Sequence, residues 1–253
     1  MGKVIAITGK GGTGKTALAA MLIRHLLNKG KKGSILVIDA DPDANLSETL
    51  GVRVNKTVGE AREYMQEARF NVPPDYDKQK LFQAKLFEVL HEEDGYDLLV
   101  MGRSEGSGCY CFVNSLLKGI MDETIEDYDV VIIDTPAGLE HISRKTISDL
   151  DFLIVVTDAS KRGLTTAERI RELAKEIELG YKNLYVVANK VDDKSRDQVV
   201  KNASGLNLKV IGIIPYDENL ARFDLVGDPL INLPDDSPAI VEVEEHIVNE
   251  IGI

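Results

Sequence analysis

Gly9–Thr16 constrains this chain more than any other segment. It reads GKGGTGKT, which matches the pattern G-x-x-x-x-G-K-[ST]. It lies directly after a predicted strand, Val4–Thr8, and opens a predicted helix, Lys15–Asn28. Glycines at these spacings allow backbone N–H groups to wrap phosphate oxygens, and the helix N-terminus adds a favourable dipole. We therefore expect phosphate binding at the first strand–helix junction.

The side chains of this loop have separate expected roles. Lys15 should reach the β- and γ-phosphates of a nucleotide, and Thr16 should offer its hydroxyl to Mg²⁺. The residues expected to contact nucleotide here are Gly11, Gly12, Thr13, Gly14, Lys15 and Thr16.

Short β-branched runs alternate with helical stretches along the chain, a pattern typical of repeated βαβ units and a parallel sheet. The predicted strands are Val4–Thr8, Ile35–Ile38, Leu98–Met101, Val130–Ile133, Phe152–Thr157, Leu184–Ala188 and Val210–Ile214. The predicted helices are Lys15–Asn28, Thr57–Arg69, Lys78–Leu90, Phe112–Asp122, Thr165–Leu179 and Pro238–Asn249. The sequence predicts an α/β fold: a single-domain P-loop NTPase over residues 1–253, with a mainly parallel sheet flanked by helices and a helical insertion around residues 55–93.

Charge and composition narrow the classes of partner. A formal charge of −12 disfavours binding to nucleic acid or to an anionic membrane, since both need basic faces. No run approaches the roughly 18 apolar residues of a membrane span. The start of the chain leads straight into a strand, and two cysteines are too few for a disulfide scaffold. We expect a cytoplasmic protein.

Lys10 makes the loop more specific. A lysine directly after the first glycine is the signature of the deviant Walker A motif, and the loop resembles that of the MinD/ParA/nitrogenase-iron-protein group. The resemblance implies a homodimer in which Lys10 crosses to the partner's phosphates, as an arginine finger would. Ala17 departs from the pattern, because many relatives carry a second hydroxyl residue there, and this puts an α-phosphate contact in doubt.

Two acidic segments follow predicted strands. Asp39 and Asp41 lie in a segment that resembles the group's switch I, which implies that Asp41 orients or activates the attacking water and that Asp39 lies near Mg²⁺. Asp134 and Gly138 lie in a segment that resembles Walker B and switch II. A carboxylate at a strand end can hold Mg²⁺ or its waters, although it can also be a simple helix cap. Gly138 could offer its N–H to the γ-phosphate.

The base-binding residues are expected after two later strands. Asn189 is placed to hydrogen-bond adenine, but its segment NKVD also resembles the NKxD guanine motif, so that GTP stays open. Pro215 and Tyr216 resemble a second loop on the adenine side, which contacts the base through its backbone. Turn chemistry alone is the alternative for both segments. The deviant loop favours ATP.

Cys109 and Cys111 are the chain's only cysteines, one residue apart in a glycine-rich segment. Thiolates bind Zn²⁺, Ni²⁺ or Cu⁺ well, and a two-fold dimer would bring four of them together. The alternative is that both are small buried apolar residues.

Together, the segments GKGGTGKT, DADPDANL, GSGCYCFVNSLL, DTPAGLEHISR and IPYDE resemble the CooC/AcsF-type nickel-insertion ATPases over nearly the whole chain. The resemblance implies an ATP-hydrolysing metallochaperone. It would carry nickel, or else zinc, between the cysteine pairs of a nucleotide-dependent dimer and deliver it to carbon monoxide dehydrogenase or acetyl-CoA synthase. Lys10, Lys15 and Asp41 would be its catalytic residues.

Three alternatives stay open. The first is an iron–sulfur reductase like the nitrogenase iron protein, disfavoured because residues 138–144 contain no cysteine. The second is a MinD/ParA-type positioning ATPase, disfavoured by the acidic C-terminal segment and the net charge. The third is a nucleotide-gated metal-storage or regulatory module.

Overall fold

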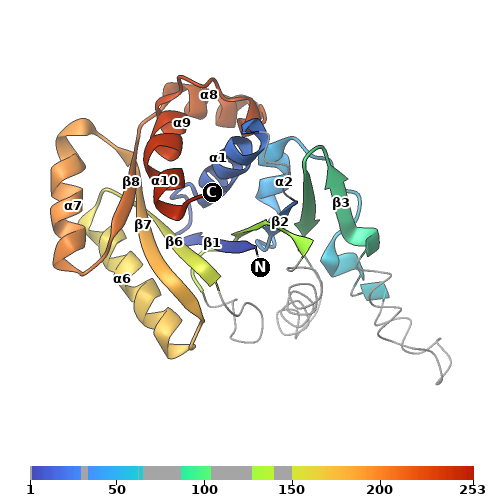
Figure 1. The fold of residues 1–253 in the computed structure, drawn as a ribbon, viewed down its shortest axis with the longest axis horizontal. Coiled ribbons are helices and arrows are strands. Elements are labelled where there is room, and N and C mark those ends of the chain that lie inside the picture. Colours follow the sequence, from blue (N-terminus) through green and yellow to red (C-terminus); the bar gives the residue numbers. More distant parts are fainter. Residues whose placement is uncertain (1, 30–33, 62, 65–86, 104–126, 140–149) are drawn as a thin grey trace.

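An eight-stranded sheet forms the centre of the molecule, with strand order β3-β4-β2-β5-β1-β6-β7-β8 (Figure 1). The structure is a computed structural model, which describes residues 2–29, 34–61, 63–64, 87–103, 127–139 and 150–253. The strands are β1 (Lys3–Gly9), β2 (Ile35–Asp39), β3 (Leu90–Glu93), β4 (Tyr96–Val100), β5 (Val130–Asp134), β6 (Leu150–Asp158), β7 (Tyr181–Val191) and β8 (Val210–Pro215). All neighbours pair in parallel except β3, which is antiparallel to β4. The predicted mainly parallel α/β sheet is confirmed.

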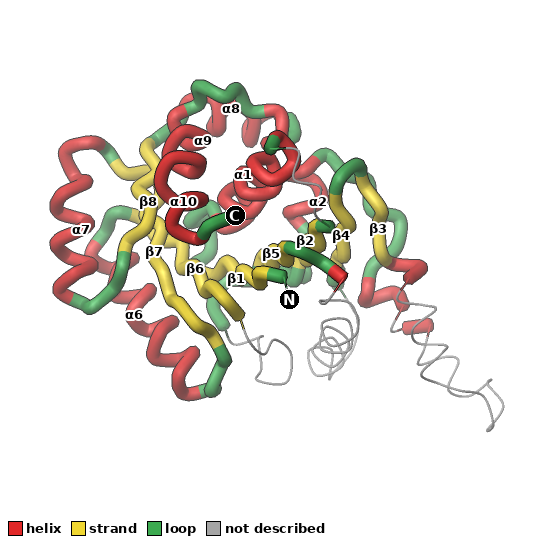
Figure 2. The backbone as a smooth tube through the Cα atoms, in the orientation of Figure 1, coloured by secondary structure: helices red, strands yellow, loops and turns green. Residues whose placement is uncertain are grey.

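Helices cover both faces of this sheet (Figures 1 and 2). They include α1 (Lys15–Asn28), α2 (Asn45–Leu50), α6 (Lys161–Glu176), α7 (Arg196–Gly205), α8 (Glu218–Val226), α9 (Pro238–Glu242) and α10 (Val248–Ile251). Short 3₁₀ segments form η2 (Asp193–Ser195) and η3 (Leu230–Asn232), and one π turn forms η4 (Val243–Ile247). One face carries α1 and the C-terminal helices, while α6 and α7 lie on the other.

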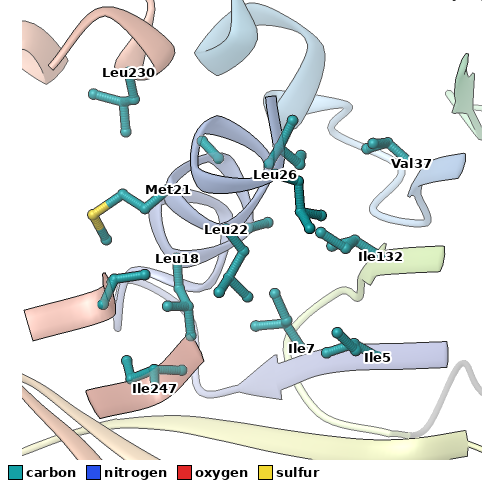
Figure 3. Packing of buried hydrophobic residues seen from close by; sticks show 14 of the residues in the cluster. Ile5, Ile7, Leu18, Met21, Leu22, Leu26, Val37, Ile132, Leu230 and Ile247 are labelled. Carbon is teal, nitrogen blue, oxygen red and sulfur yellow. The ribbon is translucent and has the colours of Figure 1, made fainter. Parts of the chain in front are cut away.

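Alternate side chains of each strand enter two separate apolar clusters. On β1, Ile5 and Ile7 pack with Leu18 and Leu22 of α1, as Figure 3 shows. Val4, next along the strand, points to the opposite cluster beneath α6. Burying each such branched side chain contributes about 1.5–3 kcal/mol. The strands are apolar along almost their whole length because helices cover both of their faces. Packing on both faces also holds β1 in place where the glycine-rich loop begins.

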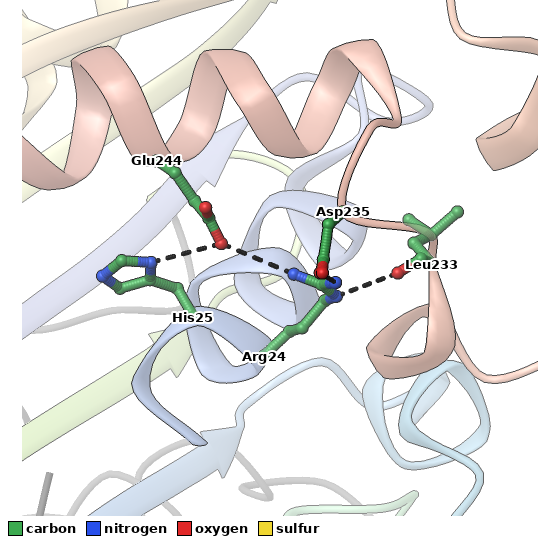
Figure 4. A network of polar contacts seen from close by, with 5 residues as sticks. All are labelled: Arg24, His25, Leu233, Asp235 and Glu244. Atoms are coloured by element: carbon green, nitrogen blue, oxygen red, sulfur yellow. Dashed lines mark hydrogen bonds and ion pairs between the residues drawn. The ribbon is translucent and has the colours of Figure 1, made fainter. Parts of the chain in front are cut away.

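A polar network ties α1 to the C-terminal segment (Figure 4). Arg24 is 4% exposed; its Nε donates to the carbonyl of Leu233 at 3.1 Å, and its guanidinium pairs with Asp235 and with Glu244. His25 Nδ1 lies 3.5 Å from the same Glu244 carboxylate. A buried guanidinium needs such partners, so the C-terminal segment fixes the helix that follows the loop.

The edge hairpin is a difference from the prediction. The helix Lys78–Leu90 was expected to end at Leu90, but Leu90 is the first residue of strand β3. The two-residue turn Asp94-Gly95, with Gly95 at φ 91°, joins β3 to β4. An Asp-Gly pair is a strong signal for a hairpin. Strand β3 was nevertheless not predicted, because it is an edge strand of the described sheet, paired only with β4, and its sequence, LHEE, is polar and does not alternate.

Several helices also differ from the prediction. The expected C-terminal helix Pro238–Asn249 is divided into α9, η4 and α10. Helix α6 begins at Lys161, before the expected start, because the Ser160 hydroxyl accepts the Gly163 N–H at 3.0 Å. Helices α2, α7 and α8 were not predicted. The expected helix Phe112–Asp122 lies outside the described residues.

Candidate functional site

The glycine-rich loop joins β1 to α1 without a side-chain cap. Gly14, with φ 94° and ψ 29°, is the residue before the helix, and its left-handed backbone suits glycine. The first N–H groups of a helix have no partner within the helix, and here no side chain caps them. A Cβ on Gly9, at φ 149°, would lie 2.2 Å from the carbonyl oxygen of Val156 on β6. The Thr13 hydroxyl donates to the carbonyl of Lys10 at 2.8 Å and closes the loop. This is a backbone suited to wrapping phosphate.

A cleft of about 640 Å³ opens beside this loop at the carboxyl ends of the central strands, where ligands of open α/β sheets bind. The loop supplies one wall, the segment after β2 supplies the second, and β7 with α8 and η3 supplies the third. Residues from these walls include Gly11, Gly12, Gly14, Lys15, Thr16, Asp41, Asn189, Lys190, Phe223 and Leu230. Lys15 lines this cleft and is only 8% exposed.

Thr16 lines the cleft and contacts Asp134, which is buried and does not itself line the cleft. The Thr16 hydroxyl donates to Asp134 Oδ2 at 2.7 Å. The other oxygen, Oδ1, is buried and has no hydrogen-bond partner in the described parts of the chain. Burial raises the pKa of Asp134 to about 6, and the nearby Asp41 adds to the rise, while the Thr16 hydroxyl and the Lys15 charge lower it. A carboxylate oxygen without a partner and a neighbouring hydroxyl are both oxygen ligands of the kind that Mg²⁺ prefers.

Asp39 faces a different environment, although it pairs with Asp134 in the register of β2 and β5. Its side chain is completely buried, and its oxygens accept the backbone N–H groups of Asp41 at 3.2 Å and Leu46 at 3.0 Å. Burial and the neighbouring Asp134 charge raise the pKa of Asp39 to about 7. The carboxyl group shapes the loop that carries Asp41 into the cleft. Its predicted place near Mg²⁺ stays a prediction.

The segment after β5 folds back on the loop. Gly138, at φ 86°, donates its N–H to the carbonyl of Gly9 at 3.2 Å, and its own carbonyl accepts the Thr8 hydroxyl at 3.1 Å. A contact between this N–H and a γ-phosphate, as predicted, would replace the bond to Gly9. The predicted phosphate contact therefore starts from a Gly138 N–H that is bonded to Gly9.

Asn189 lies where β7 meets the loop and lines the cleft. Its Nδ2 donates to the carbonyl of Thr13 at 2.8 Å, and its Oδ1 accepts the N–H of Lys190 at 2.9 Å. The side chain thus braces the loop in addition to its predicted adenine contact. Pro215 and Tyr216 lie at the end of β8, and the cleft lining does not include them; their predicted role stays a prediction.

Sequence reasoning missed the apolar part of this wall, Phe223 and Leu230. Asp217 is the residue in the sequence that could have revealed this helix, because aspartate is a preferred N-cap. Its Oδ1 accepts the N–H groups of Asn219 and Leu220 at 2.8 and 3.2 Å and so caps the N-terminus of α8. Helix α8 then places Phe223 at the cleft.

The predicted metal ligands Cys109 and Cys111 lie outside the described residues. Within the described ranges, no group of three or more His, Cys, Asp and Glu side chains could hold a metal ion. In the same ranges, no helix has the length and apolar character needed to cross a membrane.

Comparison with known proteins agrees with this geometry. The CobQ/CobB/MinD/ParA nucleotide binding domain matches residues 4–230. An uncharacterized ATP-binding protein of Methanocaldococcus jannaschii is 51% identical over 244 residues, 96% of each chain. Carbon monoxide dehydrogenase accessory protein CooC of Rhodospirillum rubrum is 34% identical over 243 residues, 88% of this chain and 87% of CooC.

A solved structure has the same fold. The septum site-determining protein MinD of Pyrococcus horikoshii, complexed with Mg-ADP, superposes with a TM-score of 0.72, covering 100% of this chain and 98% of MinD at 22% identity. The glycine-rich loop, the cleft and the family match together lead to one conclusion: the chain is a P-loop ATPase of the CobQ/CobB/MinD/ParA nucleotide-binding family.

Proposed function

We propose that this ATPase is a metallochaperone of the CooC type, which inserts nickel into the active-site cluster of carbon monoxide dehydrogenase or acetyl-CoA synthase. The observation that carries the proposal is the 34% identity to CooC over 88% of this chain, combined with the Cys109 and Cys111 pair. Nickel is the cargo in this proposal, with zinc as the second candidate metal. Thiolates bind both ions well.

The nucleotide site would work through a small set of side chains. Lys15 and the loop N–H groups bind the phosphates, and Thr16 with the orphaned Asp134 oxygen would hold Mg²⁺, which neutralises phosphate charge. Asp41, which lines the cleft, orients the attacking water. The Mg-ADP complex of the MinD structure supports Mg²⁺ as the metal here.

The functional unit in this proposal is a homodimer. Lys10 is exposed, which leaves it available to reach a partner's phosphates. One Cys109 and Cys111 pair from each copy would supply the four thiolates of a shared site. Because ATP and metal both favour the same dimer, each should strengthen binding of the other by the same factor.

The decisive experiment measures Ni²⁺ and Zn²⁺ affinity with and without a non-hydrolysable ATP analogue. We expect one metal ion per two chains and tighter binding with the analogue. The double variant Cys109→Ser/Cys111→Ser should lose metal binding and keep nucleotide binding. A metal affinity that the double variant leaves unchanged would refute the metallochaperone proposal.

The client is tested in the same purified system. Nickel-loaded dimer should activate nickel-free carbon monoxide dehydrogenase or acetyl-CoA synthase only while ATP is hydrolysed. Asp41→Ala is the matched control, since it should load nickel but not deliver it. Purification with iron and acid-labile sulfide instead would favour the reductase alternative.

A further inference from the structure

A second hollow, of about 290 Å³, lies beside the glycine-rich loop and apart from the walls of the nucleotide cleft formed by α2 and α8. Its floor is the loop with Ala137 and Gly138, and its side is α6. The residues lining it are Gly9, Lys10, Gly11, Ala137, Gly138, Thr166, Arg169, Ile170 and Leu173. The hollow therefore brings together three parts of the chain: Lys10, which is predicted to reach the partner's phosphates, the segment after β5 that contains Gly138, and helix α6.

The charge of this hollow is positive. Lys10 and Arg169 are both exposed, and none of the described residues that line the hollow is acidic. In the described part of the chain neither cation is in an ion pair. The nearest acidic residue in sequence, Glu168, lies 3.5 Å from Arg171 instead. Two cations at one hollow repel each other, so a carboxylate placed between them is favoured.

The chain itself carries the complementary surface. Its net charge is −12, and the rim of the nucleotide cleft includes the exposed acidic residues Asp43, Glu48, Asp224 and Asp228. A Lys10 that reaches a partner's phosphates must bring the hollow to the rim of that partner's cleft. The apolar side chains of Ile170 and Leu173 would then be covered by the contact.

The geometry points to Arg169 as an anchor of the nucleotide-bound dimer: the hollow receives an acidic side chain from the cleft rim of a second copy of this chain. The inference rests on the proposed trans role of Lys10, and it adds a contact outside the nucleotide. Since Gly138 lines the same hollow and bonds to Gly9, the contact connects dimer formation with the segment that follows β5.

The test is sedimentation equilibrium of the full chain with Mg²⁺ and a non-hydrolysable ATP analogue. Arg169→Glu should weaken the dimer about tenfold or more, because a favourable charge contact becomes a repulsive one. Arg162→Glu is the matched control: it makes the same charge change at an exposed position of the same helix, away from the hollow, and should stay within about twofold of wild type. Thermal unfolding and nucleotide affinity confirm that both variants are folded.

The outcomes separate the two proposals. If Lys10→Ala weakens the dimer while Arg169→Glu behaves like Arg162→Glu, the Arg169 anchor is refuted and the trans lysine stands. If Arg169→Glu weakens the dimer while Lys10→Ala does not, the hollow is an interface and the trans lysine is refuted. A wild-type chain that stays monomeric with the analogue refutes both.

Discussion

Asn189 offers a sharp test of how the cleft is built. Its amide makes two hydrogen bonds, to the carbonyl of Thr13 and from the N–H of Lys190, and the side chain is only 6% exposed. Each such bond contributes about 1 kcal/mol net to stability, so that Asn189→Ala should lower the free energy of unfolding by about 2 kcal/mol. Urea unfolding of the nucleotide-free chain measures this loss.

The effect on binding separates bracing from base recognition. The Thr13 carbonyl belongs to the glycine-rich loop, so the loss of its partner should weaken the binding of ATP and of GTP alike. If most of the 2 kcal/mol is lost from the nucleotide-bound state, both affinities fall by up to about tenfold to thirtyfold. Asn189→Asp is the matched variant: it keeps the acceptor for the Lys190 N–H and loses the donor to Thr13. Calorimetric titration with both nucleotides gives the ratio of affinities.

Two results would refute this reasoning. An unfolding free energy within about 0.5 kcal/mol of wild type would show that the amide does not brace the loop. A loss confined to ATP, with GTP binding unchanged, would assign Asn189 to adenine recognition alone.

Three further changes probe other contacts. Gly9→Ala should abolish nucleotide binding and lower the melting temperature, because its Cβ would lie 2.2 Å from the Val156 carbonyl at a φ of 149°; unchanged binding contradicts this. The pKa of Asp134 is raised from 3.8 to about 6 by burial, so its contribution to stability is present below 3.8 and is lost as pH rises through 6. Asp134→Asn should thus stabilise the nucleotide-free chain at pH 8 by roughly 1–3 kcal/mol and not at pH 4, as urea titrations at both values will show. Arg24→Met should cost about 2 kcal/mol in the same assay, since it leaves the Leu233 carbonyl unpaired, whereas the exposure of the acidic partners limits their share.

The sequence predicted the sheet well because its central strands are nearly all apolar. Buried strands such as β1 and β5 must be apolar on both sides, so periodicity and length alone reveal them. Strand β3 has one neighbour and the sequence LHEE, and only its Asp-Gly turn marks it. Asp217 caps the N-terminus of α8, but it lies in a segment that resembles a nucleotide-binding loop, and it was not read as a capping residue for that reason.

The position of the glycine-rich loop between β1 and α1 was predictable for a related reason, because the spacing of glycines is tied directly to backbone geometry. The partners of side chains were not predictable. Nothing in the order of residues says that the Asn189 amide reaches the Thr13 carbonyl, 176 positions away, or that Arg24 meets the carbonyl of Leu233. Such contacts depend on the packing of elements that are distant in sequence.

The carboxylates of Asp39 and Asp134 show how packing assigns different roles to similar residues. Both end apolar strands, and they are partners in the β2–β5 register, so the pattern of residues predicts the same role for each. Asp39 accepts two backbone N–H groups, which commits its oxygens to the loop that carries Asp41. Asp134 accepts one hydroxyl and keeps a buried oxygen without a partner in the described residues. A buried anion with an unused acceptor is costly unless a cation completes it. The asymmetry therefore favours Asp134 as the residue that faces Mg²⁺ and Asp39 as the residue that positions the loop.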